Sequence, residues 1–247
     1  MAPLDFTLEL VAKPTECLAE EAIEMFSGLM GADPCSIALT GGNMSLLPDF
    51  GGVMVRSLML TPGASHVYTA RDENGTLVGF TIFALPGQLM CSTDEQRQNG
   101  RMVDYMNKLS PEGGAYFAET MGKDVPKAND ETFRMDASER NTYWCNLAMV
   151  RADHQGKGIA KAMFELAFTE AAKTGAMVAL TTTNIRNVRA FFVKISGVSD
   201  GLVAVGLRRS KQVPIYEKIG LKLYGERKFS SPWVEWTLWF FARESQY

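Results

Sequence analysis

The sequence predicts an α/β (α+β) protein with a central mixed, mostly antiparallel sheet, flanking helices and a helical insertion. Two apolar segments, at residues 66–70 and 77–85, surround an Asn74-Gly75 pair, which is typical of an antiparallel hairpin. Strand patterns at 143–150 and 177–180 lie on either side of a helical segment, which predicts a parallel βαβ unit. Residues 221–227 and 233–241 predict a last pair of strands.

The N-terminal region predicts a strand followed by a helix. Residues 6–10 alternate in the manner of a strand, and apolar residues then recur at helical spacing behind the candidate cap Thr15. These apolar residues are Leu18, Ala22, Met25, Phe26 and Leu29. Residues 31–52 are rich in Gly, Pro, Asp and Asn and predict a loop, followed by a short helix at 53–60.

Two further helical patterns complete the predicted elements. In the predicted insertion, residues 86–140, Ser92 and Glu95 resemble a capping box. The apolar face that follows comprises Met102, Tyr105, Met106 and Leu109. The helix after residue 157 is predicted to bury Ile159, Met163, Leu166 and Ala167 and to end at Lys173 and Gly175.

Composition favours one domain over residues 1–247, with its core in 66–85 and 141–241. The chain has 247 residues, of which 46% are hydrophobic, and no apolar run long enough to span a membrane. A net charge of -3 disfavours nucleic-acid binding, because phosphate affinity needs clustered Lys and Arg. Four cysteines without CxxC spacing disfavour a zinc site and suit a reducing compartment. We therefore expect a cytoplasmic protein with no metal and no membrane or nucleic-acid partner.

A glycine-rich segment, Gln155-Gly156-Lys157-Gly158-Ile159-Ala160, joins the strand at 143–150 to the next helix. Glycine lets the backbone approach a ligand, and the N–H groups at a helix start suit a pyrophosphate. On its own the segment is equally typical of an ordinary strand-to-helix turn. A dinucleotide-binding fold is disfavoured, because the GxGxxG pattern lacks its third glycine and no earlier strand-helix pair supports a doubly wound sheet.

With the preceding Leu147-Ala148-Met149-Val150, this segment resembles the acetyl-CoA signature Q/R-x-x-G-x-G/A of the GNAT superfamily of N-acetyltransferases. The resemblance implies that two neighbouring parallel strands, 143–150 and 177–182, splay apart to admit the cofactor. It implies that the strand around Ala148, Met149 and Val150 pairs with the pantetheine arm. It also implies that the pyrophosphate is bound by the backbone of Gln155, Gly156, Lys157, Gly158, Ile159 and Ala160.

A second motif, Tyr216-Glu217-Lys218-Ile219-Gly220-Leu221, is similar to the Y-E-K-x-G-F segment of the family, with Leu in the place of Phe. By this resemblance Tyr216 is the general acid that protonates the leaving thiolate, a role that suits a phenol of high pKa. The alternative is that Tyr216 only packs a helix against the sheet. Asn184 corresponds to the family asparagine that binds the cofactor arm, although an asparagine after a strand is also typical of a turn.

The general base is not evident from the sequence. Many relatives carry a carboxylate on the strand before the pyrophosphate loop. The residues present here are Tyr143, Trp144, Cys145 and Asn146. Glu119, Asp136 and Glu139 are candidate bases from the insertion, with solvated surface charges as the alternative, and a chain of waters is another route for the proton. Tyr143 and Trp144 either line the acceptor pocket or pack in the core.

The spacing between Asn184 and Tyr216 departs from the family pattern. The two residues are 32 positions apart, against seven in the pattern N-x-x-x-x-x-x-Y, and removing residues 188–212 restores that spacing. This segment of 25 residues begins with Val and ends with Gln, so a translated intron with GT and AG ends is one hypothesis. The other is a genuine insertion, whose apolar content at 190–193 and 202–205 suits a strand or helix.

The expected function is transfer of an acetyl group from acetyl-CoA, as co-substrate, to a small-molecule or peptide amine by direct attack. A CoA-binding module without catalysis is the alternative, favoured if residues 188–212 displace Tyr216. An interaction protein without CoA binding is a third possibility. Neither the acceptor amine nor the oligomeric state follows from the sequence.

Overall fold

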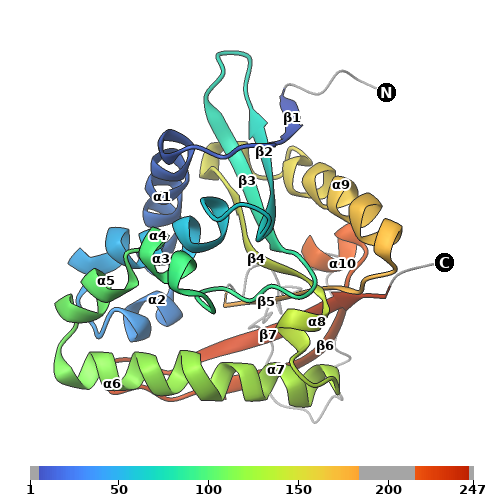
Figure 1. The fold of residues 1–247 in the computed structure, drawn as a ribbon. Coiled ribbons are helices and arrows are strands. Elements are labelled where there is room, and N and C mark those ends of the chain that lie inside the picture. Colours follow the sequence, from blue (N-terminus) through green and yellow to red (C-terminus); the bar gives the residue numbers. More distant parts are fainter. Residues whose placement is uncertain (1–5, 184–214, 245–247) are drawn as a thin grey trace, which may run out of the picture.

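The computed structural model describes residues 6–183 and 215–244, and in these a seven-stranded sheet has the order β1-β2-β3-β4-β5-β7-β6 (Figure 1). The strands are β1 (Thr7–Leu10), β2 (Ser65–Arg71), β3 (Leu77–Ala84), β4 (Tyr143–Val150), β5 (Val178–Thr182), β6 (Lys222–Phe229) and β7 (Trp236–Arg243). Neighbouring strands are antiparallel except β4 and β5, which are parallel. The predicted mixed sheet, the hairpin and the βαβ unit are confirmed.

The N-terminal helices pack against each other at a glycine. They are α1 (Glu16–Met30), α2 (Pro34–Leu39), the 3-10 turn η1 (Met44–Leu46) and α3 (Leu47–Met59). The hydroxyl of Thr15 accepts a hydrogen bond of 3.3 Å from the Leu18 amide, which confirms the predicted cap of α1. The predicted loop over 31–52 is wrong, because α2, η1 and the first half of α3 lie in it, and the helix predicted at 53–60 is the second half of α3. An added Cβ on Gly51 would lie 2.8 Å from Cδ1 of Phe26, so this glycine permits close packing of α3 on α1.

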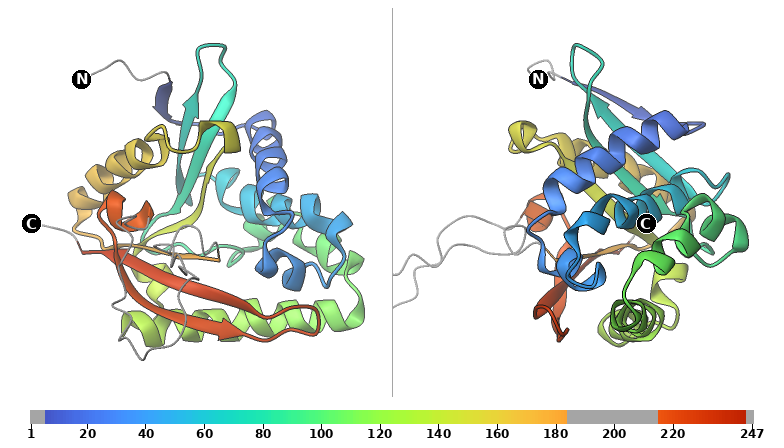
Figure 2. Two further views of the ribbon diagram at one scale, coloured as in Figure 1. Left: turned by 180° about the vertical axis from the view of Figure 1, so that it is seen from behind. Right: turned by 90° about the vertical axis from the view of Figure 1, so that its left-hand side faces the viewer.

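The connection from β3 to β4 is largely helical, as predicted. Its helices are α4 (Asp94–Asn99), α5 (Met102–Lys108), α6 (Pro111–Glu119), the π-helical turn η2 (Thr120–Asp124), α7 (Val125–Phe133) and α8 (Ser138–Asn141). The run from α6 through η2 to α7 is continuous and lies along the hairpin of β6 and β7 (Figures 1 and 2). The N-cap is one residue later than predicted, because Thr93 rather than Ser92 accepts from the Gln96 amide, at 3.1 Å. The Gln96 side chain in turn accepts from the Ser92 amide at 2.8 Å.

Helices cover the two faces of the sheet with separate apolar cores. The larger core joins α1, α2, α3 and the insertion helices to one face, and α9 (Ile159–Thr174) and α10 (Ile215–Ile219) cover the other. Helix α9 ends at Gly175, whose φ of 68° gives the predicted C-cap. Leu166 is 37% exposed, contrary to the prediction, because the buried stripe of α9 passes through Phe164 instead. No helix in the described ranges is long and apolar enough to cross a membrane.

Candidate active site

The two parallel strands separate after three residue pairs. Their ladder joins Tyr143 to Val178, Trp144 to Ala179 and Cys145 to Leu180. Beyond the last pair, β4 continues in register with β3 as far as Val150, whereas β5 continues with β7 as far as Thr182. A wedge therefore opens between β4 and β5 toward their C-terminal ends, as the resemblance implied (Figure 1).

A β-bulge lies at the apex of this wedge. Leu147 pairs with Ile82 and Cys145 with Phe83, so Asn146 has no partner on β3. A bulge bends its strand and increases the local twist, which directs the rest of β4 away from β5. The side-chain Oδ1 of Asn146 is buried and has no hydrogen-bond partner among the described residues, and its Nδ2 lies 3.9 Å from the sulfur of Met90. A polar side chain with unused acceptor capacity thus stands where the strands part.

The backbone of β4 presents polar groups to the wedge. The Arg151 amide donates to the Val78 carbonyl of β3 at 2.9 Å. Because successive residues of an antiparallel strand direct their N–H and C=O groups to opposite sides, Val150 and Ala148 direct theirs toward the wedge. The Gln155 side chain donates to the Val150 carbonyl at 3.1 Å and links the strand to the glycine-rich loop. This geometry suits an extended, amide-containing ligand laid along β4.

The glycine-rich loop holds two left-handed residues directly before α9. Gly156 and Gly158 have φ values of 81° and 85°, a conformation that other residues adopt at a cost. A Cβ at either position would meet no heavy atom within 4 Å, so the backbone is open to solvent on that side. Ala162 makes the first hydrogen bond of α9, to the Gly158 carbonyl, which leaves the amides of the first turn without intrahelical acceptors. The positive end of a helix of 16 residues suits a pyrophosphate here.

Charges beside the loop are mostly cationic. Arg151 makes an ion pair of 2.8 Å with Asp153, and Nδ1 of His154 lies 2.9 Å from the same carboxylate. These hydrogen bonds hold the pKa of Asp153 well below its ordinary range. Lys157 and Lys161 are exposed on the loop and the first turn of α9. Lys161 pairs with Glu165 at 3.6 Å and Arg151 with Asp153, so Lys157 leaves a net positive charge beside the loop, which favours an anion at the entrance to the wedge.

Tyr216 lies in α10 on the same face of the sheet as α9. Its side chain is buried, and its ring centroid is 5.1 Å from that of Phe241 in β7 and 6.2 Å from that of Phe164 in α9. These contacts fix the ring between α9 and β7, on the face of the sheet that α9 covers. The other two predictions from the same region, Asn184 and the segment 188–212, lie outside the described residues.

The candidate bases differ in their surroundings. Glu119 is exposed and pairs with Lys123 at 2.7 Å, and Asp136 is also exposed, which is the expected behaviour of surface charges. Glu139 is only partly exposed and accepts a hydrogen bond of 2.6 Å from Nδ2 of Asn129. Burial raises the pKa of Glu139 to about 7. Its place on α8, which contacts the start of β4, makes it the carboxyl of this set best suited to hold a proton near neutral pH.

Tyr143 and Trp144 are core residues on opposite faces of the sheet. The Tyr143 hydroxyl lies 2.8 Å from Nδ1 of His66 and 3.1 Å from the Tyr68 hydroxyl. Trp144 packs edge-on against Phe133 of α7 with ring centroids 5.9 Å apart. Both side chains are less than 5% exposed, so core packing accounts for them.

A carboxylate that the sequence reasoning missed lies against the end of β5. Asp33 is the N-cap of α2: its Oδ1 accepts from the amides of Cys35 at 3.0 Å and Ser36 at 3.2 Å. Its Oδ2 accepts a hydrogen bond of 2.7 Å from the hydroxyl of Thr183, the residue that follows β5. The Asp-Pro pair at 33–34 is a helix-start signal that was hidden in the predicted loop.

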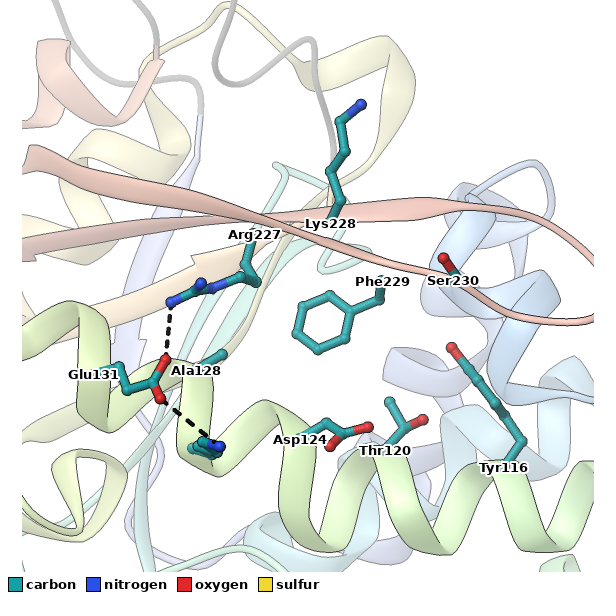
Figure 3. Close-up of a pocket in the computed structure, with 10 residues that line it drawn as sticks. Tyr116, Thr120, Asp124, Ala128, Glu131, Arg227, Lys228, Phe229 and Ser230 are labelled. Atoms are coloured by element: carbon teal, nitrogen blue, oxygen red, sulfur yellow. Dashed lines mark hydrogen bonds and ion pairs between the residues drawn. The ribbon is translucent and has the colours of Figure 1, made fainter.

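A shallow groove of about 350 Å³ lies elsewhere, between the α6–α7 helix and β6 (Figure 3). Its main charges neutralise one another, because Glu131 lies 3.0 Å from Arg227 and 4.0 Å from Lys127. The groove contains none of the predicted cofactor-binding residues. We therefore place the candidate site in the wedge.

Comparison with known proteins identifies the family. The model of the acetyltransferase (GNAT) family matches residues 55–197, which is more than half of the chain. The chain belongs to the GNAT acetyltransferase family. No curated protein sequence matches this GNAT chain.

This GNAT protein is similar to several solved structures. The structure described as histone acetyltransferase HPA2 and related acetyltransferase from Corynebacterium glutamicum is 12% identical, with a TM-score of 0.55 and 98% of each chain covered. At this identity the likeness shows a shared fold. A phosphinothricin acetyltransferase from Sinorhizobium meliloti in complex with AcCoA is 10% identical, with a TM-score of 0.46 and coverage of 98% of this chain and 89% of that one. The ribosomal-protein-S18-alanine N-acetyltransferase from Escherichia coli is 10% identical, with a TM-score of 0.46 and coverage of 98% and 95%.

Proposed function

We propose that this GNAT protein is an N-acetyltransferase that transfers acetyl from acetyl-CoA to a small-molecule or peptide amine. One observation supports this above the others: the wedge that opens after the pair of Cys145 and Leu180 leads directly to the glycine-rich start of α9. The first feature suits the amide-containing arm of the co-substrate and the second suits its pyrophosphate. β4, which forms one side of the wedge, and the glycine-rich loop lie on one continuous segment of chain, 143–161.

The residues of this segment fit acetyl-CoA as a substrate. In the proposal, the outward amides of Ala148 and Val150, with Met149 between them, bind the pantetheine arm. The loop from Gln155 through Gly156, Lys157, Gly158 and Ile159 to Ala160 binds the pyrophosphate. Asn184 is retained as a further contact to the arm. The open side of both glycines supports this role, because no heavy atom occupies the space beside them.

The proposed reaction is direct attack of a neutral amine on the thioester carbonyl. The C–N bond forms as the C–S bond breaks, and the thiolate takes a proton from the Tyr216 hydroxyl, which then regains a proton from solvent. During the attack, a backbone amide of β4 donates a hydrogen bond to the thioester carbonyl and polarises it. The amine loses a proton to water or to a carboxylate, and Glu139, with its pKa raised to about 7, is the candidate from the insertion whose pKa suits that role.

Two measurements on the full chain test this function. Isothermal titration with acetyl-CoA measures binding, and thiol release measured over a panel of amines detects transfer. The proposal predicts one acetyl-CoA bound per chain and amine-dependent thiol release. Binding without release on any amine would point to a CoA-binding module, and the absence of binding would reject the site.

A further inference from the structure

We propose that Asp33 is the acceptor-binding carboxylate of this site and that the acceptor is a diamine or polyamine, whose second, protonated amino group binds Asp33. This inference rests on the proposed acetyl transfer and adds the substrate class. It starts from the hydrogen bond of 2.7 Å between Thr183 and Asp33, which fixes the carboxylate to the end of β5 that has parted from β4.

The surroundings of Asp33 suit a carboxylate that binds a cationic ligand. It is half-buried, and burial raises its pKa in opposition to its three hydrogen bonds. None of the ion pairs formed within residues 6–183 and 215–244 includes Asp33. A half-buried carboxylate is stabilised by an adjacent ammonium group, so a cationic substrate would supply what the described residues do not.

Two other polar side chains, one at the apex of the wedge and one next to Asp33, have unused hydrogen-bonding capacity. Oδ1 of Asn146, at the apex of the wedge, is buried and lacks a donor among the described residues. The hydroxyl of Ser36, one helical turn from Asp33, is buried without a partner in the same part of the chain. An ammonium or amine group offers N–H donors and no competing negative charge, so it complements oxygen acceptors at this position.

The acceptor would approach from the face opposite to α9. Helix α2 contacts β7 and belongs to the core that covers this opposite face, and Met90 beside Asn146 packs on that same core. The pyrophosphate loop begins α9 on the other face. The two substrates would therefore enter the wedge from different sides and meet near its apex, where Asn146 stands.

The test compares matched pairs of amines with two charge-neutralising variants. The probes are 1,n-diaminoalkanes of three to eight carbons and the alkylamines of the same length. Asp33→Asn keeps the oxygen that caps α2, because Asn caps helices as well as Asp does. Its amide nitrogen replaces Oδ2 and can donate to the Thr183 hydroxyl, which is able to accept as well as to donate. Asp72→Asn is the matched control, because the Asp72 carboxylate likewise accepts two backbone amides, from Asn74 at 3.0 Å and Thr76 at 2.9 Å, in the β2–β3 turn.

We expect the wild type and Asp72→Asn to favour the best diamine over its alkylamine by about 10-fold or more in kcat/KM, mainly through KM. In Asp33→Asn this preference should fall to about one, with acetyl-CoA affinity and Tm unchanged. The assignment of Asp33 would be overturned if Asp33→Asn keeps the preference for diamines, or if the wild type shows no such preference. In both cases amine-dependent thiol release would still support acetyl transfer. A wild type that neither binds acetyl-CoA nor releases thiol would overturn both proposals.

Discussion

Cys145 of β4 pairs with Leu180 of β5, and this pair is the last in the only parallel ladder of the described sheet. The next residue of β4, Asn146, is the bulge that turns the strand away. The distance over which the two strands stay paired thus sets the depth of the wedge. A short ladder followed by a bulge is how this chain separates two neighbouring strands inside a continuous sheet.

The left-handed glycine at the start of α9 gives the sharpest test of the pyrophosphate loop. Gly158→Ala adds strain of about 1–2 kcal/mol, because φ is 85° there. Movement of the loop would relieve this strain. We expect the Kd for acetyl-CoA to rise at least about 10-fold, with Tm falling by roughly 2–8 °C. Gly63→Ala is the control, since Gly63 has φ 72° and equal empty space but lies before β2. Equal acetyl-CoA affinity in both variants would show that the loop is not part of the binding site.

Replacement of Tyr216 by Phe separates chemistry from packing. The ring contacts with Phe164 and Phe241 remain in Tyr216→Phe, so Tm and the Kd for acetyl-CoA should change little. Loss of the proposed general acid should lower kcat by about 100-fold or more. Steady-state thiol release measures this, with the partly exposed Tyr224→Phe as the control. An unchanged kcat in Tyr216→Phe would leave the tyrosine with a packing role only.

Glu139 predicts a pH-dependent difference in stability. Its pKa is about 7 in the folded protein and 4.5 ordinarily, so the folded state keeps a proton that the unfolded chain has lost between these values. The stability of the wild type therefore falls as pH rises from about 4.5 to 7, relative to Glu139→Gln, which does not titrate. Above pH 7 the variant should be more stable by on the order of 1–3 kcal/mol, as measured by urea unfolding.

The matched control for Glu139 is Glu119→Gln, which alters an exposed carboxylate paired with Lys123. Its effect should stay below about 1 kcal/mol. If the difference between wild type and Glu139→Gln is the same at pH 5 and pH 8, Glu139 is not held in a shifted state by its surroundings.

The segment 188–212 is tested by peptide mapping of the protein purified from its native source. If the segment is absent from the mature chain, trypsin should release a peptide in which Asn187 is joined to Val213 and which ends at Lys218. A genuine insertion predicts instead a peptide that begins at Gln212. Detection of the Gln212 peptide alone rejects the intron hypothesis.

The elements with strict periodicity could be predicted from the sequence, and the N-terminal helices could not. β4 has the predicted bounds, because apolar content and flanking turns define a buried strand. The helices within 31–52 were missed because Gly51 and Asp33-Pro34 are loop signals in isolation. Their role depends on tertiary contacts, such as the position of Phe26 beside Gly51, that no local pattern shows.

The parts of the candidate site that are local in sequence could likewise be predicted, and the parts that depend on the fold could not. The glycine-rich loop and β4 are local in sequence, so their motif was visible. The junction of Asp33 and Thr183 joins residues 150 positions apart. A carboxylate at such a junction is visible only once the fold brings β5 to the start of α2, so no local motif predicts it.

Hydrogen exchange with mass spectrometry, with and without acetyl-CoA, tests the central claim most directly because it locates the ligand on the chain. We predict slower exchange of the amides at 147–150 and 156–161 when acetyl-CoA is present. The amides at 116–131, which border the groove of Figure 3, should not change. Unchanged exchange at both wedge segments, or protection at 116–131 alone, would contradict an acetyl-CoA site between β4 and β5.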